Sequence, residues 1–196
     1  MKLYYSLASP YSRKVLMLAR SLGMGNDVEV IMANPLDNGA ELLKVNPLNK
    51  VPALIQGGKT YFDSPVIVEH LLVLAGQESV GEHFLKRLEV QALADGIMDA
   101  AVAIRMESVR PDAEQSEMWK GRWHLAIERG LKMVEETVID GLAGWKIDSI
   151  TVACMLDYLN FRLPDIDWRA ACPKAAAWFA EAEKRNDMIV TDPRKG

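Results

Sequence analysis

Residues 49–65 read Asn-Lys-Val-Pro-Ala-Leu-Ile-Gln-Gly-Gly-Lys-Thr-Tyr-Phe-Asp-Ser-Pro, and they decide the fold more than any other stretch of the chain. A strand beginning at Val51-Pro52 is followed by a tight Gly57-Gly58 turn, a second strand, and a helix that begins at Ser64-Pro65. The start of the first strand and the start of the helix, joined by this hairpin, can bind a short peptide by both of its ends. The stretch therefore predicts a peptide-like ligand.

The Val51-Pro52 pair is the first half of this predicted pocket. The peptide bond before a proline costs only about 0.5 to 1 kcal/mol to become cis, and the residue before it prefers extended geometry. If this bond is cis, the N–H and C=O of Val51 turn out of the sheet and can pair with an extended ligand. A trans Pro52 that only begins a strand is the commoner alternative, and the pair alone does not decide between them.

The second half is the helix start at Ser64-Pro65, which matches an N-cap followed by the proline favoured at the first helical position. Such a terminus offers unpaired N–H groups and the positive end of the helix dipole to a ligand carboxylate. Asp63 beside it suits an ammonium group. Together these features describe the head of an amino acid, whereas the alternative is a plain capped helix with a solvated Asp63.

A second Ser-Pro pair, Ser9-Pro10, opens the helix that follows the first strand. In a thioredoxin-like fold a reactive thiol sits at this helix start, where the dipole and hydrogen-bond donors lower its pKa. The chain has no cysteine there, since its two cysteines are Cys154 and Cys172. We therefore expect a bound cosubstrate to bring the thiol and the Ser9 hydroxyl to stabilise the thiolate. The alternative is that Ser9 only caps the helix.

Composition excludes several classes of protein. The 196 residues are 49% hydrophobic, and 23 basic against 27 acidic residues give a net charge of −4 without a basic block, which argues against nucleic acid as a partner. Two distant cysteines predict a reducing, cytoplasmic location, and we expect neither a signal peptide nor a membrane span. The scattered His70, His83 and His124 predict no metal site.

The hydrophobic pattern predicts an α/β half followed by an all-helical half. The thioredoxin-like domain is expected at 1–76 and the helical bundle at 82–196, joined by a linker at 77–81. Glycines 96, 121 and 130 lie inside helical patterns and are expected at close helix contacts. The predicted strands are 3–6, 28–32, 53–55 and 59–62. The predicted helices are 10–22, 40–44, 66–75, 82–109, 113–139, 150–162 and 174–185. The helix at 150–162 is apolar nearly all round, so we expect it at the centre of the bundle.

In this order, these motifs resemble the N-terminal domain of bacterial glutathione S-transferases, and the likeness extends over nearly the whole chain, closest to short, serine-bearing members. The resemblance implies glutathione as cosubstrate and no metal. It makes Ser9 the thiol-activating residue, and it assigns glutathione binding to Lys50, Val51, Pro52 (in cis), Asp63 and Ser64. Two departures stand out: Asn49 replaces a frequent glycine, and the helix-capping motif reads Ser149-Ile150-Thr151-Val152, without its final Asp.

The resemblance also implies a homodimer and a second pocket, for a small hydrophobic electrophile, between the two halves. Tyr11, Asp99, Arg105 and Met106 are its candidate contacts. The predicted activity is conjugation of the glutathione thiolate to that electrophile. The alternatives are a non-catalytic interaction protein of the same fold, a glutathione-dependent disulfide or peroxide reductase, and an isomerase or dehalogenase.

Overall fold

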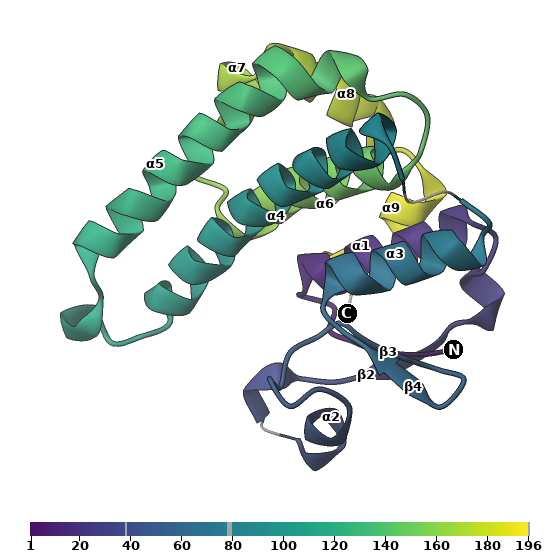
Figure 1. Cartoon of the computed structure of the whole chain (residues 1–196). Helices are drawn as coiled ribbons and strands as arrows, with labels where there is room; N and C mark the ends of the chain where they lie inside the picture. Colours follow the sequence, from purple (N-terminus) through teal and green to yellow (C-terminus); the bar gives the residue numbers. More distant parts are fainter. Residues whose placement is uncertain (38, 78–79, 196) are drawn as a thin grey trace.

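The computed structural model describes residues 1–37, 39–77 and 80–195, in which a four-stranded sheet with three helices precedes a helical bundle (Figure 1). The strands are β1 (Lys2–Tyr5), β2 (Glu29–Met32), β3 (Ala53–Gln56) and β4 (Lys59–Tyr61). The helices are α1 (Pro10–Ser21), α2 (Ala40–Val45), α3 (Ser64–Leu74), α4 (Glu82–Ser108), α5 (Glu117–Met133), α6 (Ile147–Arg162), α7 (Trp168–Ala171), α8 (Pro173–Ala182) and α9 (Asn186–Val190).

The sheet has the strand order β2-β1-β3-β4, with β1 parallel to β2 and antiparallel to β3, and β3 antiparallel to β4. Helices α1 and α3 lie together on one face of the sheet, and α2 lies on the opposite side (Figure 1). A small apolar cluster that includes Tyr4, Leu42, Val45 and Ala53 joins the sheet to α2. This is the predicted thioredoxin-like arrangement, so the expected fold class is confirmed for this half.

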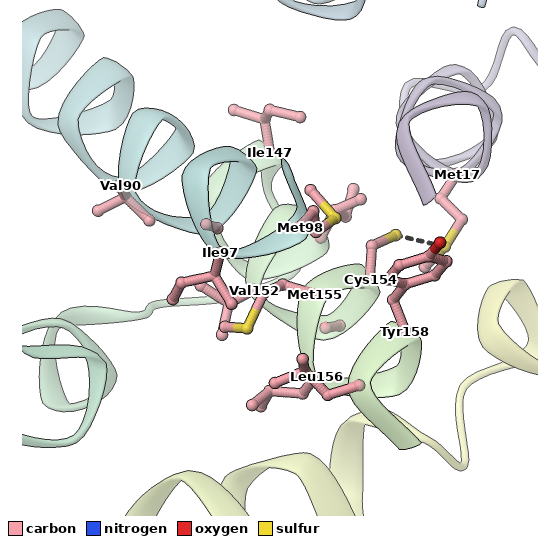
Figure 2. Close-up of a cluster of buried hydrophobic side chains, with 14 of the residues drawn as sticks. Met17, Val90, Ile97, Met98, Ile147, Val152, Cys154, Met155, Leu156 and Tyr158 are labelled. Carbon is pink, nitrogen blue, oxygen red and sulfur yellow. Dashed lines mark hydrogen bonds between the residues drawn. The ribbon is translucent and has the colours of Figure 1, made fainter. Parts of the chain in front are cut away.

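Helix α6 is the centre of the helical half, as its sequence predicted. All of its residues from Ile147 to Leu159 except Asp148 are buried. Figure 2 shows Val152 and Met155 of α6 beside Ile97 of α4, in the same apolar core. Because α6 also packs on α1, one continuous core extends from the sheet's α1 face through the bundle.

The contact between α1 and α6 includes two sulfur atoms. The Cys154 thiol donates a hydrogen bond to the Met17 sulfur at 3.6 Å, and both side chains are buried (Figure 2). Cys154 is therefore a core residue that joins the helical half to α1.

Several helix boundaries differ from the prediction. Helix α5 stops at Met133, and residues Val134–Val138 continue as a π-helical turn. Helix α6 begins at Ile147, three residues before the predicted start, with Lys146 at its N-cap position. The expectation that Ser149 caps this helix is wrong, because Ser149 is the third helical residue and its buried hydroxyl has no hydrogen-bond partner among the described residues. The short helices α7 and α9 were not predicted.

The predicted linker 77–81 includes residues 78 and 79, which lie outside the described residues, and the division into domains 1–76 and 82–196 stays a prediction. Across residues 1–37, 39–77 and 80–195, no helix combines the length and apolar composition needed to cross a membrane.

Candidate functional site

A cleft of about 750 Å³ lies between the α/β half and helices α4 and α6. All ten residues singled out from the sequence line it: Ser9, Tyr11, Lys50, Val51, Pro52, Asp63, Ser64, Asp99, Arg105 and Met106. The fold brings them together from the start of α1, the segment before β3, the start of α3 and one face of α4. Their individual roles stay predictions.

Ser9 holds the N-cap position of α1, in extended geometry. Its Oγ accepts a hydrogen bond from the backbone N–H of Ser12 at 3.1 Å, and Pro10 occupies the first helical turn. Cap formation uses only an acceptor lone pair, and the Ser9 hydroxyl donates to no group among the described residues. The hydroxyl hydrogen is therefore available to a ligand in the cleft, so capping and ligand binding are compatible.

The segment before β3 is built to present Val51. The Val51–Pro52 peptide bond is cis, and Val51 takes no part in the strand pairing of the sheet, which begins at Ala53. The carbonyl of Lys50 accepts a hydrogen bond from the Asn46 side chain at 2.9 Å, which fixes the backbone one residue earlier. Val51 thus offers its backbone N–H and C=O at the edge of the cleft.

The backbone conformation of Asn49 explains why asparagine can stand where a glycine is frequent. Its φ of 52° lies in the left-handed region, which glycine adopts freely and asparagine tolerates better than most residues. The Asn49 side chain also donates a hydrogen bond to the carbonyl of Pro35 at 2.7 Å. Asparagine therefore supplies the turn that glycine usually makes and ties it to the loop after β2.

The start of α3 forms the opposite wall. The helix begins at Ser64, with Asp63 rather than Ser64 in the N-cap position, one residue earlier than the sequence suggested. Ser64 is buried, Asp63 is exposed, and Pro65 follows in the first turn. The unpaired N–H groups of this turn and the exposed Asp63 carboxylate lie at the same edge of the cleft, where they can bind a carboxylate and an ammonium group, respectively.

Two contacts join α1 to the α4 wall of the cleft. The Tyr11 hydroxyl donates a hydrogen bond to Asp99, and burial with this bond raises the pKa of Tyr11 well above its ordinary value. The fully buried Lys14 ammonium lies 2.7 Å from each carboxylate oxygen of Asp95. Burial raises the pKa of Asp95, and the nearby Lys14 opposes that shift. These pairs fix α4 against the first helix.

Tyr158 and Arg162 also line the cleft, and the sequence reasoning missed both. They lie one turn apart on α6, so their side chains share one face of the helix. Burial raises the pKa of Tyr158, and Arg162 and Arg105 act in the opposite direction. The only sequence signal was their i, i+4 spacing at the polar end of an apolar helix, which does not reveal that α4 lies opposite.

Neither cysteine lines the cleft. Both are free and buried, and burial raises the pKa of Cys172 and raises that of Cys154 to about 12. Such thiols are protonated and unreactive at neutral pH. Among residues 1–37, 39–77 and 80–195, no group of three or more His, Cys, Asp or Glu side chains is arranged to hold a metal ion.

A helix start without a cysteine, a Val51 segment that ends in a cis proline and lines the cleft, and an acidic helix start at Asp63 together define a thioredoxin-like fold that can bind a thiol-bearing peptide. Residues 3–79 match the family described as the N-terminal domain of glutathione S-transferase. A relative from Escherichia coli (strain K12), described as the uncharacterized GST-like protein YibF, is 34% identical over 203 residues and covers 100% of both chains. The chain belongs to the glutathione S-transferase family.

Solved structures of relatives agree with this assignment. A glutathione transferase family member from Pseudomonas fluorescens Pf-5, crystallised with bound glutathione, has a TM-score of 0.92 and 37% identity, covering 98% of each chain. A structure from the same organism with bound S-(propanoic acid)-glutathione has a TM-score of 0.88 and 36% identity, covering 98% of this chain and 99% of the other. The architecture is thus the glutathione S-transferase fold.

Proposed function

We propose that the protein binds glutathione in the cleft and transfers its thiolate to a small electrophile. The observation that carries this proposal is that Ser9 lines the same cleft as Val51 and the start of α3. An amino-acid head bound at Asp63 and Ser64, and a backbone paired with Val51, would extend the ligand from α3 toward α1. The glutathione bound in the Pseudomonas relative supports this ligand for a chain of the same architecture.

Each wall has a role in glutathione binding. The γ-glutamyl carboxylate would accept hydrogen bonds from the first turn of α3 and Ser64, and its ammonium would pair with Asp63. The cysteinyl residue would pair with Val51 beside Pro52 as an added strand. Lys50 is exposed at the cleft and would lie near the glycyl carboxylate. A charged partner for each end of the ligand fixes its orientation.

The chemistry that the protein would assist is ionisation of the glutathione thiol. A hydrogen bond donated by Ser9 and the positive end of α1 both favour the thiolate. Lowering the thiol pKa by about 2 units corresponds to about 2.7 kcal/mol. The thiol proton passes to solvent, the thiolate forms a carbon–sulfur bond, and the leaving group departs with its bonding electron pair.

The remaining space suits the electrophile. Val102, Ala103 and Met106 of α4 line the cleft beyond Tyr11 and Asp99 and give it an apolar wall. The S-(propanoic acid)-glutathione bound to the Pseudomonas relative supports a pocket that accepts a substituent on the glutathione sulfur. Space for a substituent on the glutathione sulfur favours conjugation over a non-catalytic role, because a protein that only interacts with partners would not need that space.

We also propose a homodimer in the cytoplasm. Val66 and Val73 on α3 and Leu85 on α4 are large apolar side chains exposed in the single chain, and a second copy would cover them. Both cysteines are free thiols, in keeping with a reducing compartment. Light scattering coupled to size-exclusion chromatography tests the dimer, and a monomer at micromolar concentration would contradict it.

Calorimetric titration of glutathione tests the proposed function. We expect binding to the wild type and about tenfold weaker binding to Asp63→Asn, which loses the charge facing the ammonium. Asp165→Asn makes the same charge change at an exposed residue outside the cleft and should bind like the wild type. Absence of glutathione binding by the wild type would instead favour an interaction protein of this fold.

A further inference from the structure

Two arginines lie at the end of the cleft formed by the helical half. Arg105 comes from the last turns of α4, and Arg162 is the last residue of α6. Both line the cleft together with the buried Tyr158, and their charges lower the pKa of its hydroxyl against the effect of burial. Two helices that are far apart in sequence thus bring two positive charges to one point of the cleft.

These two guanidinium groups lack the carboxylate partners that several other arginines have. Among the described residues, no carboxylate lies within 4.0 Å of Arg105 or Arg162, whereas Arg13, Arg20 and Arg87 each form an ion pair. Both side chains are half-buried, and the Nε of Arg162 is buried without a hydrogen-bond partner in the described part of the chain. Partly desolvated, unpaired positive charge is costly, and an anion in the cleft would offset that cost.

The plane of the Arg162 guanidinium is already held in place. The Arg162 guanidinium lies 4.0 Å from the ring centroid of Phe161, which restricts its orientation. The Tyr158 hydroxyl lines the cleft and donates no hydrogen bond to any described residue, so its hydrogen can be donated to a ligand. Two guanidinium groups and one hydroxyl are a donor set that suits a carboxylate.

The polarity of the cleft changes along α4. Asp95 and Asp99 lie at the end near α1, where Lys14 and Tyr11 are their partners. The apolar residues Val102 and Ala103 come next, followed by Arg105, which is about 9 Å farther along the helix axis than Asp99. A ligand that extends from Ser9 along this wall meets apolar surface first and positive charge last.

We propose that Arg105 and Arg162, together with the Tyr158 hydroxyl, bind a carboxylate of the second substrate, so that the electrophile is an acid with an apolar body between its carboxylate and its reactive carbon. This inference rests on the proposed glutathione-binding function. It assigns Arg162 and Tyr158 to the substrate pocket and gives Arg105, a candidate contact already, a specific ligand group.

Matched pairs of S-substituted glutathiones test this inference by calorimetry. Each S-(carboxyalkyl)glutathione, with one to six methylene groups, is compared with its uncharged carboxamide, which has nearly the same shape. We expect the wild type to prefer the acid by about tenfold at the best chain length. The preference should fall close to one in Arg105→Gln and in Arg162→Gln, and it should partly return in Arg105→Lys and Arg162→Lys.

Two controls distinguish binding of the carboxylate by these arginines from a general effect of protein charge or of misfolding. Arg129→Gln removes one positive charge from an exposed position of α5 and should keep the preference for the acid. Unsubstituted glutathione should bind all variants within about twofold of the wild type, which also verifies that they are folded.

The outcomes distinguish this inference from the function on which it rests. Binding of glutathione without a preference for the acid at any chain length would overturn the anion subsite and leave the proposed function standing. Equal weakening of unsubstituted and substituted glutathione in the arginine variants would also overturn it, since the arginines would then contact glutathione itself. No binding of any glutathione by the wild type would overturn both.

Discussion

The Arg13 guanidinium donates a hydrogen bond to the Asp157 carboxylate, and this buried ion pair joins α1 to α6. Arg13 also donates to Thr191 Oγ1 at 3.0 Å and to the Met188 carbonyl at 2.9 Å, while Arg194 reaches Asp157 at 3.1 Å. The C-terminal segment, α1 and α6 therefore share one polar network directly behind the helix start that carries Ser9.

Asp157→Ala should lower the free energy of unfolding by about 3 to 5 kcal/mol, because it leaves the buried Arg13 charge without its carboxylate. Asp187→Ala is the matched control. It removes the partner of the more exposed Arg20 and should cost about 1 kcal/mol or less. Urea unfolding of the three proteins measures both values. Equal losses in the two variants would mean that the Arg13–Asp157 pair contributes no more than a surface pair.

Gly130 marks a close approach of α5 to α4. A Cβ at this position would lie 2.6 Å from Cγ1 and 2.7 Å from Cδ1 of the buried Ile97. At Gly121, and also at Gly96, a Cβ would meet nothing within 4 Å, so the expectation of close contacts is confirmed only for Gly130.

Gly130→Ala should therefore destabilise the protein by about 1 to 3 kcal/mol, since Ile97 must move out of its packed position. Gly121→Ala gains helix propensity without a clash and should stabilise by about 0.5 to 1 kcal/mol. Thermal unfolding of both variants gives the comparison. A gain of stability in Gly130→Ala would show that the two helices can separate at little cost.

Cys154 should make stability fall at alkaline pH. Burial raises the pKa of its thiol from the ordinary value of 9.0 to about 12. The unfolded chain loses this proton first, so stability is fully present below pH 9 and is lost as pH rises toward 12. This group adds a slope of up to about 1.4 kcal/mol per pH unit to the free energy of unfolding.

Denaturant unfolding between about pH 9 and pH 11 measures that slope. Cys154→Ala should show a shallower decline than the wild type, whatever packing free energy it loses at neutral pH. Identical slopes in the two proteins would mean that the Cys154 thiol ionises as readily in the folded protein as in the unfolded chain.

Local chemistry made the walls of the cleft predictable. Val51-Pro52, the Gly57-Gly58 turn and the two Ser-Pro pairs each specify geometry within a few neighbouring residues, and so the strands and helix starts near them could be read from the sequence. The buried, central position of helix α6 was equally predictable, because a segment that is apolar on nearly all sides must be buried.

Features that depend on tertiary packing could not be predicted in this way. Arg162 and Tyr158 join Arg105 only because α6 crosses α4, and no pattern within either helix encodes that crossing. The sequence predicts the start of α6 three residues late because Ser149 resembles a cap, whereas Lys146 occupies that position without side-chain capping. Helices as short as α7 and α9 carry too few periodic residues to be distinguished from turns.

The role of Ser9 in ionising the glutathione thiol can be measured without interference from the protein's own thiols. Burial raises the pKa of Cys154 and Cys172, so neither forms thiolate near neutral pH. The ultraviolet absorbance of the thiolate in a complex with glutathione therefore reports the bound ligand. Ser9→Thr keeps a hydroxyl and a helix cap, whereas Ser9→Ala removes both.

The pKa of the bound glutathione thiol, read from a pH titration of that absorbance, measures thiol activation directly. The wild type and Ser9→Thr should lower it by about 2 units from the free value, and Ser9→Ala should raise it again while binding glutathione with similar affinity. A thiol pKa that is the same in wild type and Ser9→Ala would remove Ser9 from the mechanism, and one equal to that of free glutathione would contradict activation by this site altogether.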